Sequence, residues 1–566
     1  MIAVTPSSVP SSSRQEQTGK AIRLGAVSNF GQGWTEESYS AVQRFRISRL
    51  RDSIRWAEVE RTPGRYVFNG RKSAWPDRFQ AENVKITLTL AGGNPLYDGG
   101  NTPHSPAALA AFGRFAAAVV KRYPQIDTVE IGNEFNSGNF VSGPVKTDGL
   151  ARRAQHHLAI LEAVAAAVRK VRPGISVIGG SSHSIAAGYL WPLLERPESR
   201  LMDGLAMHPY TTDIDQLPRQ IEFLKRDPHA AKLPLFITEF GSEDRVLAAD
   251  DLVRGYVTLA STGAAEFDWY PLNERGDGLV PLVRKDGTVT KAGQAFLFVQ
   301  SNMRGMPVQD ISPDEFTFVR RIGNKMLALW GAPRDVRLAR RDITASDATG
   351  AKLDPSRLHL EEGRALILTS ESPINFASDV KLGCNPLIAD SFYQFSYAQP
   401  GTASKRSGFI RSVRIGKEDF PLSVMEGQQK PGVPWTPYLG RSNLVSLQLH
   451  PGMMVPAFGA KGGAIIHRLM TESPADVRVR AIFTPVGTGD NEIIVTVAHA
   501  GESIVSKSGK GPIKLDISVA LRKGESVLLS AVQSENSNSG KFRYRIQALD
   551  EHRCPALPPE LDLPPN

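Results

Sequence analysis

The sequence predicts a (β/α)8 barrel followed by two all-β domains, and three observations lead to this fold class. Between residues 21 and 303, short apolar runs alternate eight times with longer segments of helical periodicity. After residue 304 the helical segments give way to short β-type runs separated by turn residues. The length of 566 residues is too great for one compact domain and suits a large domain with one or two smaller ones.

The barrel prediction depends on eight strand-like runs and the segments between them. Residues 106–123 and 150–171 carry apolar side chains at three- and four-residue spacing, as an amphipathic helix requires. The expected strands are residues 23–30, 47–54, 84–91, 128–132, 176–180, 205–208, 235–238 and 266–270. In such a barrel the functional residues follow the carboxyl ends of the strands, so these positions are the ones to inspect.

The second half of the chain divides into two β-rich units. Residues 304–376 contain alternating runs that predict a small β-sandwich. Residues 377–550 contain evenly spaced strands between Gly, Asn, Ser and Lys turns, which favour a jelly-roll-like domain. In this domain Trp435 and Tyr438 could stack on a sugar or pack in the core. The aromatic cluster at 392–397 could be one of its strands, and residues 551–566 form a Pro-rich tail expected to be extended.

Composition argues against two classes of protein. No apolar run approaches the length of about eighteen residues needed to cross a bilayer. The net charge of +9 is spread over the chain without a Lys/Arg tract, so nucleic-acid binding is not indicated. An anionic substrate such as an acidic polysaccharide remains compatible with this charge.

The chain start and the cysteines give weaker signals. Residues 1–20 are rich in Ser, Pro and Gln and are predicted to be a disordered tail. No apolar core of a signal peptide is legible there. Cys384 and Cys554 are the two cysteines and lack CxxC spacing, so a zinc site is not indicated. One disulfide between them is left open.

Two glutamates stand at the ends of predicted strands. Glu134 follows the run DTVEIGN, and Glu239 follows the apolar segment PLFIT. Hydrogen-bonding and aromatic side chains follow the other strands, and such a mixture suits a sugar, which has an apolar ring face and many hydroxyls. The candidate site residues are Glu134 and Glu239 for catalysis, with Arg51, Asn94, Asn133, His183, His208, Tyr210 and Trp269 for substrate binding.

These motifs, in this order, resemble clan A glycoside hydrolases and are most similar to family 39 and its bacterial exopolysaccharide-degrading relatives. The matching segments are Arg51-Asp52 with Trp56, the stretch 93–98, Asn133-Glu134, His208-Pro209-Tyr210 and residues 238–241. The resemblance covers about half of the chain. Two departures stand out, because the family pattern usually has Trp where this chain has Gly132 and Pro where it has Phe135. They leave the implied chemistry intact but weaken any inherited substrate.

The resemblance implies retaining hydrolysis of a polysaccharide or oligosaccharide, from bacterial exopolysaccharide or plant cell wall. Glu239 would be the nucleophile, and Glu134 the acid/base with a raised pKa. Asn133 would hold the 2-hydroxyl, Tyr210 and Arg51 would contact Glu239, and Trp269 would form the floor of the sugar subsite. No metal or organic cofactor is required.

Three further expectations come with this reading. The domain that follows a glycosidase-like barrel would be a carbohydrate-binding module. The protein would work outside the cytoplasm, as a secreted, periplasmic or cell-surface protein. The alternatives are a non-catalytic glycan-binding protein on a glycosidase-like barrel and a component of polysaccharide assembly or export. The oligomeric state does not follow from the sequence.

Overall fold

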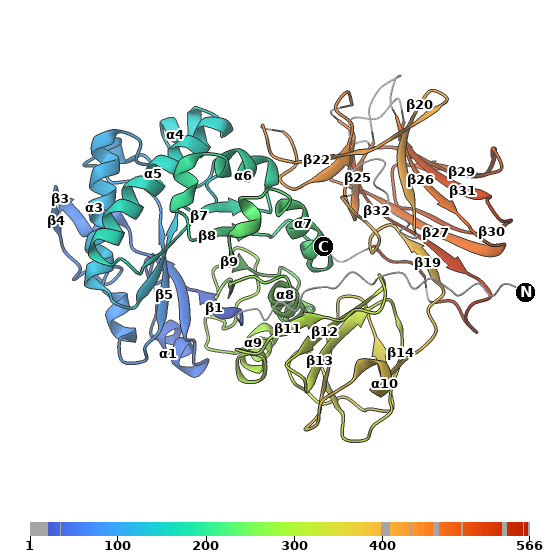
Figure 1. Cartoon of the computed structure of the whole chain (residues 1–566), viewed down its shortest axis with the longest axis horizontal. Helices are drawn as coiled ribbons and strands as arrows, with labels where there is room; N and C mark the ends of the chain where they lie inside the picture. The colour runs from blue at the N-terminus through green and yellow to red at the C-terminus, as the bar shows by residue number, and fades with distance from the viewer. Residues whose placement is uncertain are drawn as a thin grey trace, which may run out of the picture.

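The computed structural model describes residues 21–33, 35–397, 408–430, 432–444, 446–456, 463–487, 491–534, 540–558 and 560–563. The tail predicted to be disordered, residues 1–20, lies outside this part of the chain. In Figure 1 the barrel, blue to green, occupies one side of the molecule. A yellow sandwich and an orange-to-red third domain occupy the other side.

Eight parallel strands close the predicted barrel in the order β1-β10-β9-β8-β7-β6-β5-β2. All eight sequence-predicted runs contribute a strand. Because helices cover the outside and side chains fill the inside, the strands are buried on both faces and read as nearly continuous apolar runs. The strands are β1 (Arg23–Val27), β2 (Arg49–Ser53), β5 (Lys85–Leu90), β6 (Ile126–Ile131), β7 (Ser176–His183), β8 (Gly204–His208), β9 (Leu235–Phe240) and β10 (Glu266–Trp269).

Helices surround the barrel, with one irregular connection. Between β2 and β5 the chain forms only short elements: α2 (Trp56–Val59), the hairpin strands β3 (Glu60–Thr62) and β4 (Arg65–Tyr66), and a 3-10 turn, Trp75–Phe79. The main helices are α1 (Glu36–Arg44), α3 (Pro106–Arg122), α5 (Leu150–Val171), α6 (Ala187–Leu194), α7 (Leu217–Leu224), α8 (Ala248–Ser261) and α9 (Lys291–Asn302), and the short α4 (Pro144–Thr147) precedes α5.

Helix α3 shows how the sequence specifies these elements. The Ser105 side chain caps the helix by accepting a hydrogen bond from the Ala108 amide at 3.2 Å, and Pro106 occupies the first turn, where no amide donor is needed. Phe112, Phe115 and the neighbouring alanines and valines at helical spacing are buried. The helix therefore packs one apolar face onto the barrel and turns the other to solvent.

The second unit is a β-sandwich with its own core. One sheet has the order β11-β12-β13-β17-β15 and the other β16-β14-β18. Strand β18 belongs to this unit but lies beyond residue 376, where the sequence analysis placed the end of the unit. The boundary was placed too early because a three-residue strand leaves little pattern in the sequence. The strands are β11 (Val308–Asp310), β12 (Thr317–Ile322), β13 (Met326–Gly331), β14 (Arg334–Leu338), β15 (Thr344–Ser346), β16 (Leu358–Leu360), β17 (Leu366–Thr369) and β18 (Val380–Leu382), with α10 (Phe376–Asp379) before β18.

The third unit consists of two antiparallel sheets that face each other. One follows the order β22-β23-β24-β25-β32-β27-β30 with β19 beside β32, and the other β21-β20-β26-β31-β28-β29. The strands are β19 (Leu387–Asp390), β20 (Ile410–Ile415), β21 (Glu418–Pro421), β22 (Ser423–Met425), β23 (Tyr438–Gly440), β24 (Gln448–Leu449), β25 (Met453–Val455), β26 (Ala464–Met470), β27 (Ala475–Val486), β28 (Ile493–His499), β29 (Glu502–Gly509), β30 (Ile513–Leu521), β31 (Ser526–Gln533) and β32 (Lys541–Asp550).

The third unit is tied to the rest of the chain at several points. Residues 392–397 form a buried turn against α7 rather than the strand that the sequence suggested, because their aromatic rings pack between the units. Arg545 is buried between Asp390 and Glu362 of the sandwich, with the shortest bond, to Glu362, at 2.6 Å. Cys384 and Cys554 form a disulfide that joins the two ends of the third unit.

Within the described part of the chain, every helix is too short or too polar to cross a bilayer.

Candidate active site

Glu239 stands near the carboxyl end of β9, at the mouth of the barrel, between two fixed partners. The Arg51 guanidinium, from β2, donates a hydrogen bond and forms an ion pair with one carboxylate oxygen. The Tyr210 hydroxyl, two residues beyond β8, donates to the other oxygen at 3.1 Å. Both contacts agree with what the family resemblance implied. They fix the carboxylate in one orientation.

Glu134 follows β6 on a strained turn. Its φ is +41°, in a region that side chains other than glycine rarely adopt. The turn is held by two backbone hydrogen bonds, from the Phe135 amide to the Ser181 carbonyl at 2.8 Å and from the Ser137 amide to the Glu134 carbonyl at 2.7 Å. This backbone path lifts Glu134 off the strand and aims its carboxylate across the barrel mouth.

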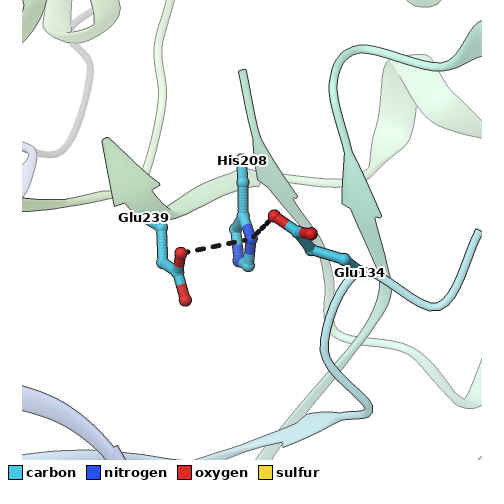
Figure 2. A group of neighbouring side chains, drawn as sticks. All are labelled: Glu134, His208 and Glu239. Atoms are coloured by element: carbon cyan, nitrogen blue, oxygen red, sulfur yellow. Dashed lines mark hydrogen bonds and ion pairs between the residues drawn. The ribbon is translucent and has the colours of Figure 1, made fainter. Parts of the chain in front are cut away.

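His208, the last residue of β8, lies between the two glutamates (Figure 2). Its Nδ1 is 3.1 Å from Glu134 Oε1 and 3.6 Å from Glu239 Oε2. The Glu134 oxygen also contacts Nδ1 of His183 at 3.1 Å. One oxygen of each glutamate and a nitrogen of His208 all lie within 4.8 Å of one another. The two carboxyl groups therefore lie close together at the mouth of the barrel.

The pKa of Glu134 differs from the sequence-based expectation. Burial acts to raise it, but hydrogen bonds from His183 and His208 and the positive charge of His208 outweigh burial and lower the pKa to about 2. The expected raised pKa is therefore wrong for the protein without substrate. The sequence could not reveal this, because the two histidines come from strands distant along the chain.

His208 holds the proton that Glu134 lacks. Burial acts to lower its pKa, but the charge of Glu239 and hydrogen bonds to Glu130 and Glu134 raise it to about 9. The imidazolium donates from Nδ1 to Glu134 and from Nε2 to the Thr238 hydroxyl at 3.1 Å. His208 is fully buried and contacts the carboxylates, so the prediction that it binds substrate directly is wrong.

Beneath these residues lies Glu130, a fully buried glutamate of β6 that was not among the candidate site residues. It accepts hydrogen bonds from Arg51 Nε at 2.7 Å, Thr89 at 2.8 Å and Thr238 at 2.9 Å. Burial opposes its charge, but Arg51 and His208 hold its pKa well below the usual range. Glu130 therefore anchors Arg51 under Glu239. Its position in the middle of an apolar strand was the available signal, since a charged residue there must be paired.

Two predicted substrate-binding residues are corrected by their burial. Trp269 is fully buried, and its indole nitrogen donates to the Val280 carbonyl at 3.1 Å, so its ring offers no face to a sugar. Asn94 is 1% exposed; it donates to the Glu60 carbonyl at 2.8 Å and accepts from the Leu96 amide at 3.0 Å. Asn94 shapes a loop, and Trp269 belongs to the core.

Asn133 and His183 remain at the site. Arg51 donates to the Asn133 carboxamide oxygen at 2.7 Å, and this bond orients the amide beside Glu239. His183 is 23% exposed and lies against Trp435 of the third unit, with ring centroids 4.9 Å apart in an edge-to-face contact. Trp435 is half-buried, whereas Tyr438 is buried in the core. The sequence named Trp435 as a stacking candidate but could not place it beside the glutamates.

Two cavities meet at this site. One, of about 750 Å³, is lined by His183, Tyr210 and Glu239 and is otherwise built by barrel loops. The other, of about 1050 Å³, lies between barrel loops and the third unit and includes Asn136 and Trp435 in its lining. Thr212 and Asp213 line both.

No protein-family model and no curated protein sequence matches the chain. Among solved structures it resembles a family 39 glycoside hydrolase from the gut symbiont Bacteroides cellulosilyticus WH2, with a TM-score of 0.51 and 17% identity over 62% of this chain and 81% of that one. Over that part of the chain, the two proteins share a fold.

Other solved structures similar to the chain are also glycoside hydrolases. A family 39 β-xylosidase from Caulobacter crescentus and a family 30 endoxylanase from Clostridium papyrosolvens C71 each align with a TM-score of 0.46 and 14% identity, over 62% of this chain and 97% of theirs. Of these three structures only the one from Bacteroides exceeds a TM-score of 0.5, so the fold assignment rests on it.

The two departures from the family pattern, at Gly132 and Phe135, are one coupled change. Gly132 has a φ of +79°, and a β-carbon there would lie 2.5 Å from the Phe135 ring. The Phe135 ring therefore occupies the space beside residue 132, and a Trp at that position would require Phe135 to move. The glycine also permits the left-handed turn that leads into Glu134.

Glu134, His208 and Glu239 are close enough to share a metal ion. A metal ligand histidine must be neutral, however, and the raised pKa of His208 favours the imidazolium. Both of its ring nitrogens already bond to Glu134 and Thr238. These three residues are therefore better suited to share a proton than to bind a metal ion.

Proposed function

We propose that the protein is a retaining glycoside hydrolase that cleaves O-glycosidic bonds of a polysaccharide or oligosaccharide by double displacement. The observation that carries this proposal is the approach of one Glu134 oxygen and one Glu239 oxygen to within 4.8 Å at the mouth of the barrel. That spacing leaves room for direct attack by a carboxylate, whereas an inverting enzyme needs about 6.5–9.5 Å to fit a water.

In the first step Glu239 attacks the anomeric carbon and forms a covalent glycosyl ester. Arg51 forms an ion pair with this carboxylate, and the hydrogen bond from Tyr210 fixes the second oxygen so that the first can reach the sugar. Asn133, oriented by Arg51, is placed to donate its amide to the 2-hydroxyl, a bond that strengthens in the transition state.

Glu134 delivers the proton to the departing oxygen. Because its own pKa is low in the free protein, the proton is stored on His208, 3.1 Å away. A sugar that covers the site removes water and disfavours the charged pair, which moves the proton from His208 Nδ1 to the Glu134 carboxylate. His208 is thus a positioning residue that supplies a proton to Glu134.

In the second step water attacks the ester and Glu134 removes its proton. Once Glu239 is esterified its negative charge is gone, so His208 is held less strongly in its charged form. Glu134 passes the proton it gains back to His208, and hydrolysis of the ester restores the ionised Glu239. Each group returns to its starting state.

We further propose that the substrate is a bacterial exopolysaccharide or plant cell-wall glycan and that the protein works outside the cytoplasm. The disulfide between Cys384 and Cys554 supports this location, since such bonds persist in oxidising compartments.

The test is covalent trapping. Wild-type protein and Glu239→Gln are incubated with a panel of activated 2-fluoro glycosides, and adducts are located by mass spectrometry. A sugar on Glu239 of the wild type, and none on the variant, is the expected result and also identifies the glycone. Glycan binding without an adduct or hydrolysis across the panel would instead favour the non-catalytic alternatives.

A further inference from the structure

The cavity between the barrel and the third unit has no role in the double displacement itself. Its volume of about 1050 Å³ reaches the upper end of the range for small-molecule sites, about 300–1,000 Å³, so it has room for more than one sugar ring. One wall comes from the loops after β6 and β8, and the other from the third unit. Figure 1 shows β22 reaching towards α6 at this junction.

Direct contacts hold the two walls together. Asn136, two residues after Glu134, donates to the Gln428 side chain at 2.7 Å. The Gly188 amide, at the start of α6, donates to the Glu426 carbonyl at 3.0 Å. The same third-unit loop continues to Trp435, whose ring lies against His183. The cavity is therefore a built part of the molecule that begins beside the general acid.

The position of the cavity identifies which part of a substrate it would hold. A general acid must lie within hydrogen-bond reach of the oxygen that departs. Asn136, two residues after Glu134, lines this cavity, as does Trp435, which lies against the His183 ring that contacts Glu134. Glu239 lines the other cavity, so this one lies on the Glu134 side of the pair. The chain released in the first step would extend in this direction.

The charges that line the cavity are strongly unequal. Five basic residues line it, Lys146, Arg153, Lys430, Lys541 and Arg543. Arg153 is 8% exposed, and its guanidinium donates hydrogen bonds to the carbonyls of residues 136, 145 and 146 rather than to a carboxylate. Among the described residues, Lys146, Lys430 and Lys541 form no ion pair either. These three lysines and Arg153 thus bring positive charge to the cavity without a carboxylate partner among the described residues.

Little negative charge offsets it. Asp213 is the only carboxylate among the described residues that line the cavity, and burial together with the neighbouring Asp215 raises its pKa to about 7. His450, also in the lining, is kept neutral because burial lowers its pKa to about 4. The cavity is consequently positive over the range in which a sugar carboxylate is ionised.

We propose that this interdomain cavity is the leaving-group subsite and that it takes a glycan segment bearing carboxylate groups, with Trp435 stacking on a sugar ring. This inference rests on the proposed function for the direction of the chain, and it names the substrate class. The five cations recognise the carboxylates, and the half-buried indole supplies the apolar surface that a pyranose ring face requires.

The experiment measures binding by the full chain with Glu239→Gln, which removes turnover. The probes are oligogalacturonate, oligoalginate and hyaluronan fragments, each beside its carboxyl-reduced counterpart. We expect at least one acidic probe to bind about tenfold more tightly than its reduced form, with affinity that falls as salt is added. Adding Lys430→Gln and Lys541→Gln together is expected to weaken that binding by about tenfold.

Lys523→Gln is the matched control, since Lys523 is an exposed lysine of the same unit that does not line the cavity, and it is expected to change nothing. Equal binding of acidic and reduced probes, or binding of none of the three acids, would overturn the inference. Hydrolysis of a small activated aryl glycoside by the wild type is scored separately. Hydrolysis without acid-selective binding refutes the subsite alone, whereas acid-selective binding without hydrolysis or trapping refutes the proposed function alone.

Discussion

The two cavities beside the catalytic pair differ in charge and in origin. The one next to Glu239 is built by barrel loops and carries several carboxylates, among them Glu243, Asp244 and Asp277. The one on the Glu134 side is shared with the third unit and is lined mainly by cations. A polymer with an acidic segment would be disfavoured in the first cavity and favoured in the second, which would fix the direction in which it lies across the glutamates.

The proposals thus assign bond cleavage and the choice of leaving group to different parts of the molecule. The residues proposed to break the bond come from the ends of barrel strands, where the functional residues of such barrels lie. The residues proposed to choose the leaving group come in large part from a domain that begins more than a hundred residues after the last barrel strand. The two properties can therefore be altered separately, and variants can test this.

The largest effect is expected from removing Glu134, the proposed general acid. Glu134→Ala should lower kcat/KM for glycans with poor leaving groups by about 10²–10⁴-fold, because general acid catalysis is lost. The loss should be smaller for activated aryl glycosides, and added azide should restore turnover by replacing water. Steady-state kinetics measure both. Glu243→Gln, in the acidic cavity, is the control; an equal loss on activated and unactivated substrates would contradict the role of Glu134.

A smaller and more selective effect is expected at Trp435. Trp435→Ala should raise KM for oligosaccharides by about tenfold, or about 1.4 kcal/mol, through lost stacking in the basic cavity. Trp435→Phe should recover much of this affinity, because an aromatic face is restored. A loss that is the same for a small aryl glycoside and a long glycan would mean that Trp435 only supports His183.

The pH dependence tests where the proton is stored. With the pKa of His208 raised to about 9, the wild type should keep activity well above neutral pH and lose it as pH approaches 9. His208→Asn should move this basic limb down by roughly one unit or more, since Glu134 must then hold the proton without the imidazole. A pH profile of kcat/KM that is unchanged by the substitution would refute proton storage on His208.

The same pKa predicts a trend in stability. A pKa raised from 6.5 to about 9 contributes free energy of unfolding that is fully present below pH 6.5 and is lost as pH rises through 9. Denaturant unfolding of the wild type should therefore show declining stability over this window, and His208→Asn should show a weaker decline.

The smallest effect on activity is expected at the disulfide. Cys384→Ser should lower the free energy of unfolding of the third unit by about 2–5 kcal/mol, because the link closes a long loop. Catalysis on a small aryl glycoside should change little at temperatures where the unit stays folded. Thermal unfolding with and without reductant measures this, and identical wild-type curves would contradict it.

Much of the barrel and its chemistry could be predicted from sequence. Strand ends can be located from apolar runs, and the order of Arg51, Asn133, Glu134, Tyr210 and Glu239 along them places all five at one mouth. The structure brings these residues together. A local pattern suffices because each residue needs only its own strand to position it.

The remaining features depend on packing between distant segments. Whether Trp269 faces a sugar or the core is decided by the loop that supplies the Val280 carbonyl. The pKa of Glu134 is set by histidines on two other strands. Trp435 reaches the site only because the third unit docks against α6 and α7. These contacts leave no periodic pattern in the sequence, so they could not be predicted from it.

The loop that carries Gln428 and Trp435 into the barrel mouth also has an evolutionary consequence. Changes in this loop can alter which polymer is accepted without touching the strands that hold Glu134 and Glu239. Selection could thus redirect such a protein to a new polymer through a short surface segment, while the costly arrangement of buried charges beneath Glu239 is inherited intact. Lineages that meet different polysaccharides would then diverge first at this loop and last at the barrel strands.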